Sequence, residues 1–182
     1  KGELLHASYG RSSLYLVMKE RVGDQMQGGV VKLPVRFTSS AMRLRFNPHD
    51  GQLYNAGLKG WQSNAVLPAG FDRIRYTGKP VYSVAGLKVD KGGGHLTFTQ
   101  ALNRKSAEDL QNWGGKRWNY RRTVAYGSPE FSVEHPDQRG KDELKIEAAK
   151  LSTDAKTVTL RVADLKPVMQ QTIAFQLQAK DG

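Results

Sequence analysis

The sequence predicts an all-β fold, an antiparallel β-sandwich with one short helix, from three observations. Apolar and polar residues alternate with a period of two in most segments, which is typical of strands with one buried face. Turn signals separate these segments at intervals of roughly 8–12 residues, as in a sandwich or barrel of short strands. The 182 residues include 19 glycines and 7 prolines, a turn-rich composition.

Strands are expected in the first part of the chain wherever a short apolar or alternating run is bounded by turn residues. These runs lie at residues 14–18, 30–35, 41–46, 52–57 and 73–77. The turn signal Asn47–Gly51 joins the third run to the fourth and predicts a hairpin. Residues 57–72 are polar and rich in glycine, so we expect a loop in which Trp61 is an anchoring aromatic.

The second part repeats this pattern around one helical signal. The expected strands lie at residues 81–84, 86–89, 95–99, 144–148, 157–162 and 172–178. Lys91–Gly94 predicts the turn between the second and third of these strands, and 152–156 the turn between the fourth and fifth. Ser106, followed by Glu108 and Asp109, predicts a helix that begins with Ser106 as its N-cap.

Gly78–Pro80 is the candidate boundary between a β-rich segment at 1–80 and a second segment at 81–182, with one fused β domain as the alternative. The chain begins with Lys1 rather than Met, so we expect it to be a piece of a longer protein. It contains no cysteine, which excludes disulfides, Cys-ligated metals and a Cys nucleophile. A run of 18 apolar residues is absent, so no membrane span is expected.

Several segments, in order, resemble the C-terminal region of very large secreted proteins of planctomycete-type bacteria. The matching segments are 25–34, 42–48, 50–54, 57–62, 73–80, 126–132 and 164–170, which together extend over most of the chain. Motifs within them include Gly60-Trp61-Gln62 and Tyr126-Gly127-Ser128-Pro129.

The resemblance implies that residues 1–80 form the last blade of a β-propeller and that 81–182 form an Ig-like or jelly-roll-like tail. The family's full-length members often carry a cytochrome c-type haem domain and are described as sugar dehydrogenases. It also implies a secreted, periplasmic or cell-surface location and the remainder of a parent protein as partner. No family catalytic residue transfers to this chain, because a CxxCH haem motif requires cysteine.

The formal net charge of +11 predicts attraction to anions such as acidic polysaccharide, nucleic acid or an anionic membrane surface. The excess is spread along the chain rather than gathered in a basic tail, so we interpret it as a surface property of a folded body. Charge alone does not choose among these partners.

The segment Trp113–Tyr126 interleaves aromatic and basic residues. In a strand, Lys116, Trp118, Tyr120 and Arg122 share one face, and Arg117, Asn119 and Arg121 share the other. Such a surface stacks on sugar rings or bases and binds sulfate, carboxylate or phosphate. The alternative is that Trp118 and Tyr120 belong to the core. Trp113, beside two glycines, is the tryptophan of this segment that we expect to be exposed.

Trp61 is a second candidate for ligand binding, either as a platform on a loop or as a plug over the end of a sheet. Arg43 and Arg45 lie on one face of their expected strand, and Arg73 and Arg75 on one face of theirs. If those strands were neighbours, the four arginines would form a positive stripe. The alternative is a solvated sheet face.

Metal and catalytic motifs are weak. The loop carboxylates Asp50, Asp72, Asp137, Asp142 and Glu143 allow a structural calcium ion, although no DxDxDG loop is present. The four histidines form no HxH or HExxH pattern, and no GxSxG motif occurs. We therefore predict no cofactor and no enzyme activity.

The expected function is that of a non-catalytic carbohydrate-binding module for an anionic, sulfated or uronic-acid polysaccharide. The alternative is a structural or assembly segment of a larger sugar oxidoreductase, which would be marked by an exposed apolar patch. Nucleic-acid binding ranks third because no RRM, KH, helix-turn-helix or zinc pattern is present.

Overall fold

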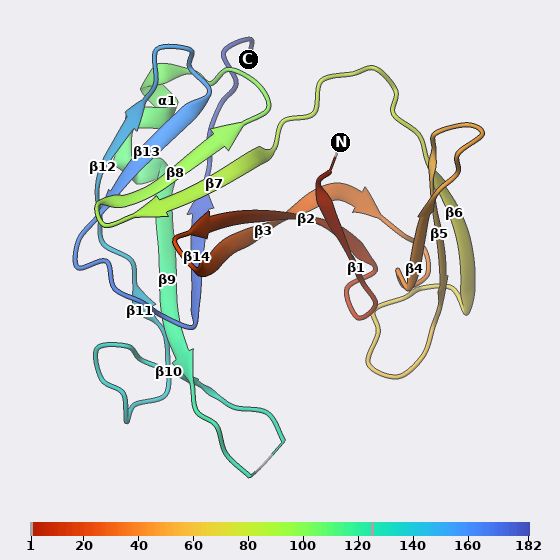
Figure 1. Cartoon of the computed structure of the whole chain (residues 1–182), viewed down its shortest axis with the longest axis horizontal. Coiled ribbons are helices and arrows are strands. Elements are labelled where there is room, and N and C mark those ends of the chain that lie inside the picture. The colour runs from red at the N-terminus through yellow and green to blue at the C-terminus, as the bar shows by residue number, and fades with distance from the viewer. Residues whose placement is uncertain (1, 125) are drawn as a thin grey trace. The chain divides into compact units, whose positions relative to one another are not determined.

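The computed structural model describes residues 2–124 and 126–182, and nearly all of its regular structure is strand (Figure 1). Strands account for 49% of the residues and helical turns for 4%, which confirms the all-β prediction. All strand pairings are antiparallel within the described residues. No helix in these residues is long and apolar enough to cross a membrane.

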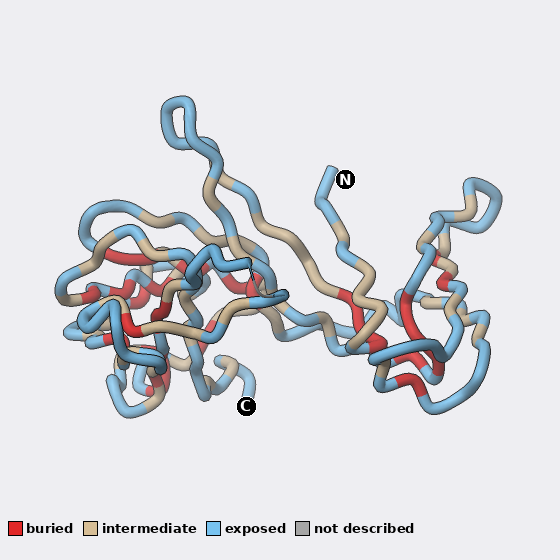
Figure 2. Tube along the Cα trace, turned by 90° about the horizontal axis from the view of Figure 1, so that it is seen from below, coloured by how far each residue is buried: buried red, intermediate tan, exposed pale blue. Residues whose placement is uncertain are grey.

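The chain divides into two compact units, one ending at Leu87 and the other beginning at Lys88. The division falls inside a strand, Val84–Asp90 (β7), whereas the sequence placed a boundary at Gly78–Pro80. Figure 2 shows buried stretches in red within each unit, so each unit has buried residues of its own.

The first unit contains two antiparallel three-stranded sheets. One has the order β1-β2-β3 and the other β4-β5-β6. The strands span Leu4–Ser8 (β1), Ser13–Val22 (β2), Gln25–Arg36 (β3), Arg43–Phe46 (β4), Leu53–Leu58 (β5) and Ala69–Ile74 (β6). The predicted hairpin around Asn47–Gly51 is confirmed, because β4 pairs with β5. The predicted strand at 73–77 is placed too late, since β6 begins inside the expected loop.

The two sheets of this unit share one core. Its buried members are Leu14, Phe37, Ala41 and Leu53. Half-buried side chains from both sheets pack against them: Leu5, Ala7, Leu33, Val35, Leu44 and Ile74. Alternate residues of a strand point to opposite faces, so the strand residues next to these core residues point outward. The arrangement is sandwich-like, and it leaves the outer face of each sheet available for other contacts.

The second unit also contains two sheets. The first has the order β12-β13-β8-β7; in the second, β9 pairs with β10, β11 and β14. The remaining strand bounds are Gly93–Phe98 (β8), Trp113–Tyr120 (β9), Glu130–Phe131 (β10), Asp142–Glu143 (β11), Ile146–Leu151 (β12), Thr157–Val162 (β13) and Gln170–Phe175 (β14). Val158 and Leu160 of β13 are fully buried and anchor the core of this unit.

The helix begins earlier than the sequence predicted. It spans Arg104–Glu108 (α1) and is followed by a 3-10 turn at Leu110–Asn112 (η1). The N-cap is Asn103, whose side chain accepts a hydrogen bond from the Ser106 amide at 3.1 Å. The expectation that Ser106 caps the helix is therefore wrong, because Asn103 is an equally good cap one turn upstream. Ser106 is instead buried, and its hydroxyl oxygen accepts a hydrogen bond from the Gln178 amide.

Candidate functional site

The outer face of the β4-β5-β6 sheet combines exposed arginines with two aromatic rings, of which Phe71 is exposed and Tyr54 is half-buried. We name it the arginine–aromatic face and define it by Arg43, Arg45, Tyr54, Ala56, Phe71 and Arg73. The intervening residues Leu44, Leu53 and Ile74 pack into the core. The period of two that buries these three residues therefore directs the arginines and rings of the same strands to the opposite face.

The strand register arranges this face in two rows. Arg45 of β4 lies opposite Tyr54 of β5, which lies opposite Arg73 of β6. In the adjacent row, Arg43 lies opposite Ala56, and Ala56 lies opposite Phe71. The strands that carry the predicted arginine pairs are thus separated by β5, and Arg75 lies beyond the end of β6. The face therefore consists of three arginines around two aromatic rings, and the condition for a stripe of four arginines, that the two strands be neighbours, is not met.

Tyr54 and Phe71 stack on each other across the two rows. Their ring centroids are 5.6 Å apart, with an interplanar angle of 26°. They are diagonal neighbours on adjacent strands, a position from which aromatic side chains reach each other. Phe71 is nevertheless 75% exposed, so most of this ring is open to solvent. The ring of Phe71 therefore offers an exposed apolar surface beside the arginines of this face.

The ring of Tyr54 is held in place at its hydroxyl end. Its hydroxyl donates a 2.7 Å hydrogen bond to Oδ2 of Asp50, in the turn between β4 and β5. The Gln52 amide, the Tyr54 hydroxyl and the nearby Arg73 charge together hold the pKa of Asp50 below its usual value. This carboxylate is therefore ionised at neutral pH and fixes the orientation of Tyr54.

The arginines of this face form no ion pair among residues 2–124 and 126–182, although the charge of Arg73 acts on the nearby Asp50 carboxylate. No carboxylate lies within ion-pair distance of Arg43, Arg45 or Arg73 there, although Arg43 donates to the carbonyl oxygen of Met42. Asp72 lies between Phe71 and Arg73 in β6, so its side chain is on the inner side of the sheet. There it accepts a hydrogen bond from the buried Asn55. The positive charge of the outer face is consequently available to a ligand.

Trp61, in the loop after β5, is 76% exposed. The interpretation of this residue as a plug or anchor over the sheet is therefore wrong. The loop is held by backbone contacts instead, from Lys59 to Pro68, from Asn64 to Gly10 and from Val66 to Thr38. With the main chain fixed in this way, the indole is free to serve as a second exposed aromatic surface.

Three of the four cations at residues 116–122 are engaged within the protein, whereas Arg122 is exposed and forms no ion pair among the described residues. Arg117 is buried, and it donates to the carbonyl oxygen of Asp164 at 2.6 Å and to the carboxylates of Glu134 and Asp164. Lys116 pairs with Glu143 at 3.1 Å. The guanidinium of Arg121 pairs with Asp137 and lies 4.3 Å from the ring centroid of Phe131. Their charges are thus largely balanced by neighbouring groups, unlike those of the arginine–aromatic face.

The two tryptophans of this segment belong to the core. Trp113 is only 8% exposed; its indole N–H donates to the Ala107 carbonyl and its ring packs on Phe175. The expectation that Trp113 is exposed is therefore wrong. Trp118 is buried beneath Lys141, whose ammonium lies 4.0 Å from the ring centroid. Trp113 is covered by β14, and Trp118 by the loop that carries Lys141. Both segments are distant in sequence, so the glycines beside Trp113 give no sign of this burial.

The candidates of this segment that reach the surface are Lys116, Tyr120, Arg121 and Arg122. Tyr120 lines an open hollow of about 500 Å³. Its other lining residues are Asn119, Arg121, Phe131, Ser132, Pro136, Pro167, Val168 and Met169. The hollow is mostly apolar, and the carbonyl oxygen of Pro136 already accepts a hydrogen bond from Arg121. The lining of this hollow contains one arginine, Arg121, whereas the arginine–aromatic face contains three.

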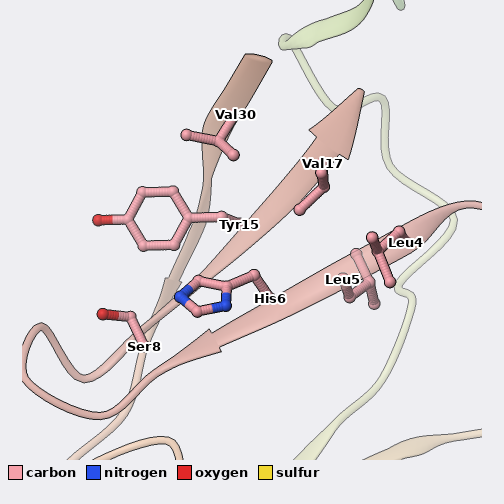
Figure 3. A pocket seen from close by; sticks show the side chains of 7 residues that line it. All are labelled: Leu4, Leu5, His6, Ser8, Tyr15, Val17 and Val30. Carbon is pink, nitrogen blue, oxygen red and sulfur yellow. The ribbon is translucent and has the colours of Figure 1, made fainter. Parts of the chain in front are cut away.

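A second open hollow, of about 510 Å³, lies on the outer face of the β1-β2-β3 sheet. Figure 3 shows the side chains that line it: Leu4, Leu5, His6, Ser8, Tyr15, Val17 and Val30. Leu4 and Val30 are more than half exposed. This hollow carries apolar surface and a single histidine, so it suits an apolar contact rather than an anion.

The loop carboxylates considered for calcium do not come together. Asp142 accepts hydrogen bonds from the Ser132 hydroxyl and from two backbone amides, while Asp137 and Glu143 pair with cations. Within the described ranges, no group of three or more His, Asp or Glu side chains could hold a metal ion. The carboxylates proposed as ligands thus serve turns and ion pairs.

One further polar cluster joins β7, β8 and β13. His95 lies between Asp90, 2.8 Å from its Nε2, and Thr159, 3.1 Å from its Nδ1. The three side chains thus place a hydroxyl, a base and an acid in contact, in that order. None of them lines either hollow described above. The contacts orient His95 across three strands.

Comparison with protein-family models, with curated proteins and with solved structures finds no match for this chain. The functional argument therefore rests on the geometry of the chain itself. Of the residues that define this face, the sequence singled out Arg43 and Arg45 as ligand-binding candidates and Arg73 as a member of a conditional arginine stripe, but it did not single out Tyr54 or Phe71. The available signal was the alternation Phe71-Asp72-Arg73-Ile74-Arg75, a period of two that begins within the expected loop.

Proposed function

We propose that this chain is a non-catalytic carbohydrate-binding module that recognises an anionic polysaccharide through the arginine–aromatic face. The observation that carries the proposal is the Tyr54–Phe71 stack, in which the Phe71 ring is 75% exposed, bordered by three arginines that form no ion pair among the described residues. In a secreted parent protein, such a module would hold the protein on a sulfated or uronic-acid glycan.

The chemistry of the face matches this ligand class. A sugar ring presents an apolar C–H surface that packs on an aromatic ring and removes both from water. Sulfate and carboxylate groups accept paired hydrogen bonds from a guanidinium. A glycan with both features uses the rings and the arginines together. Arg45 and Arg73 lie on opposite sides of Tyr54, so a bound ring would have a cation on either flank.

Affinity electrophoresis tests the proposal directly. We expect the chain to be retarded by a sulfated galactan or by polygalacturonate at moderate salt, and not by a neutral glucan. We expect Phe71→Ala to weaken the retention about ten-fold, or about 1.4 kcal/mol. The replacements Arg45→Gln and Arg73→Gln should each weaken it about three- to ten-fold and reduce its salt dependence.

Matched controls separate the face from the rest of the surface. Arg21 is an exposed strand arginine of the same unit, and Tyr126 is a fully exposed tyrosine of the other unit. Arg21→Gln and Tyr126→Ala should retain wild-type binding. Equal loss in the controls and in the face variants, or retention by every polyanion including DNA that vanishes with salt, would reduce the interaction to the net charge of +11.

The second candidate function is that of a structural or assembly segment of a larger sugar oxidoreductase. The hollow lined by Leu4, Val17 and Val30 favours it, because an open apolar sheet face is a typical contact surface between domains. It predicts that Val30→Lys would disrupt association with the remainder of the parent protein while leaving glycan retention intact. The two functions use opposite chemistry and different sheets, so the variants distinguish them.

A further inference from the structure

The arginine–aromatic face contains a single short side chain. Of its six members, five are arginine or aromatic residues, and the sixth is Ala56 on the central strand β5. Ala56 is exposed and lies between Arg43 on β4 and Phe71 on β6. We call these three residues the Ala56 row. Neighbouring strands are about 4.8 Å apart, so the Cα atoms of Arg43 and Phe71 are separated by about 10 Å, with only a methyl group between them.

From this arrangement, and resting on the proposed function, we infer that one anionic sugar ring binds directly over Ala56. Its C–H face packs on Phe71, and its carboxylate or sulfate is bound by Arg43. Ala56 is the point of the face at which a ligand comes closest to the sheet, because every other member carries a long side chain. Phe71 is open to solvent on the side that Tyr54 does not cover, which leaves ring surface for the sugar.

The next sugar ring of the ligand would lie over the second row of the face, which consists of Arg45, Tyr54 and Arg73. This row lies two residues along the strands, about 7 Å away, and it carries Arg45 and Arg73 on either side of Tyr54. Each row therefore supplies cationic groups of its own, and no uncharged row separates them. We conclude that the preferred ligand carries a negative charge on consecutive rings, as polygalacturonate does, rather than on every second ring, as hyaluronan does.

Substitution of Ala56 tests the position of the ring without changing any charge. Ala56→Val and Ala56→Leu place side-chain atoms where the sugar would lie; Val also favours strand structure, which protects the fold. Ala56→Ser is the matched small variant. We expect the Val and Leu variants to lose at least ten-fold in retention by polygalacturonate and by a sulfated galactan, and the Ser variant to stay within two-fold of wild type.

Inorganic polyphosphate is the probe that separates charge from ring packing. It carries anions but no sugar ring, so all three Ala56 variants should bind it as the wild-type chain does. Wild-type retention of both sugar polymers by Ala56→Leu would overturn the position over Ala56, while the proposed function would stand. Equal retention by hyaluronan and polygalacturonate would overturn the requirement for charge on consecutive rings. Failure of the wild-type chain to bind either charged glycan at moderate salt would overturn the proposed function itself.

Discussion

Arg117 offers a quantitative test of whether the cations of β9 serve structure rather than ligand binding. Its side chain is only 4% exposed, whereas those of its acidic partners Glu134 and Asp164 are 39% and 67% exposed. The guanidinium thus depends on the protein for its partners, while both carboxylates also reach water. Removing the acids should therefore cost more than removing the base.

The magnitudes follow from this asymmetry. Leaving a buried charge without its partner costs about 3–5 kcal/mol. In the double variant Glu134→Gln and Asp164→Asn, amide oxygens still accept hydrogen bonds and Asp142 still attracts Arg117, so we expect the low end, about 3 kcal/mol. In Arg117→Met, an apolar side chain fills most of the space and the two acids return to water. We expect that variant to lose only about 1 kcal/mol.

Urea denaturation followed by tryptophan fluorescence provides the assay. Trp113 and Trp118 are buried in the same unit as Arg117, while Trp61 is already exposed and contributes little change on unfolding. The reasoning is refuted if Arg117→Met is the more destabilised of the two. Arg117→Met should also retain wild-type binding to polygalacturonate, and a large loss of retention by the folded variant would return the β9 segment to the binding site.

Three further predictions concern stability. Trp113→Ala should lower the free energy of unfolding by about 3–5 kcal/mol in urea, because it removes a buried indole from its contacts with Phe175 and Ala107. Leu160→Ala should lower it by about 2–5 kcal/mol, since this side chain is fully buried in β13. Asp142→Asn should remove part of the loss of stability that acid causes in the wild-type chain, measured by thermal unfolding between pH 2 and 6.

The sign of the acid effect follows from the environment of Asp142. Burial alone raises the pKa of this carboxyl, but hydrogen bonds from Ser132 and from two backbone amides outweigh it and hold the pKa below the usual value. The stabilisation is therefore present above the unfolded-state pKa of about 3.9 and is lost as the pH falls through the lower folded-state pKa. Asp24→Asn, on an exposed turn, is the control; an identical acid profile in both variants would contradict the assignment.

For the two core variants, the contradicting results are equally direct. A Trp113→Ala chain as stable as the wild type would mean that the indole is not packed as described. The exposed Trp61→Ala change serves as its matched control and should alter stability by no more than about 0.5 kcal/mol. Thr159→Ala is the control for Leu160→Ala, because it lies on the exposed side of the same strand. A smaller loss for Leu160→Ala than for Thr159→Ala would contradict the assigned inner face of β13.

Alternation was a reliable guide to the faces of β4. Arg43 and Arg45 were predicted on one face of their strand, and the structure confirms this, because both are exposed while Leu44 between them packs into the core. The same rule failed to identify the start of β6, because Ala69 and Gly70 resemble loop residues in isolation. Gly70 adopts the extended conformation through pairing with Gly57 of β5, a partner that is distant in sequence.

The sequence by itself determined that this chain is all-β, that it is strongly basic, and which residues of a strand share a face. These properties depend on composition and on a local period of two, which every strand carries within itself. Only the tertiary structure decided which cations remain available: Arg117 is covered and paired, while Arg45 and Arg73 border an open aromatic stack. The physical reason is that strand register and burial arise from contacts between distant segments, and no local pattern records them.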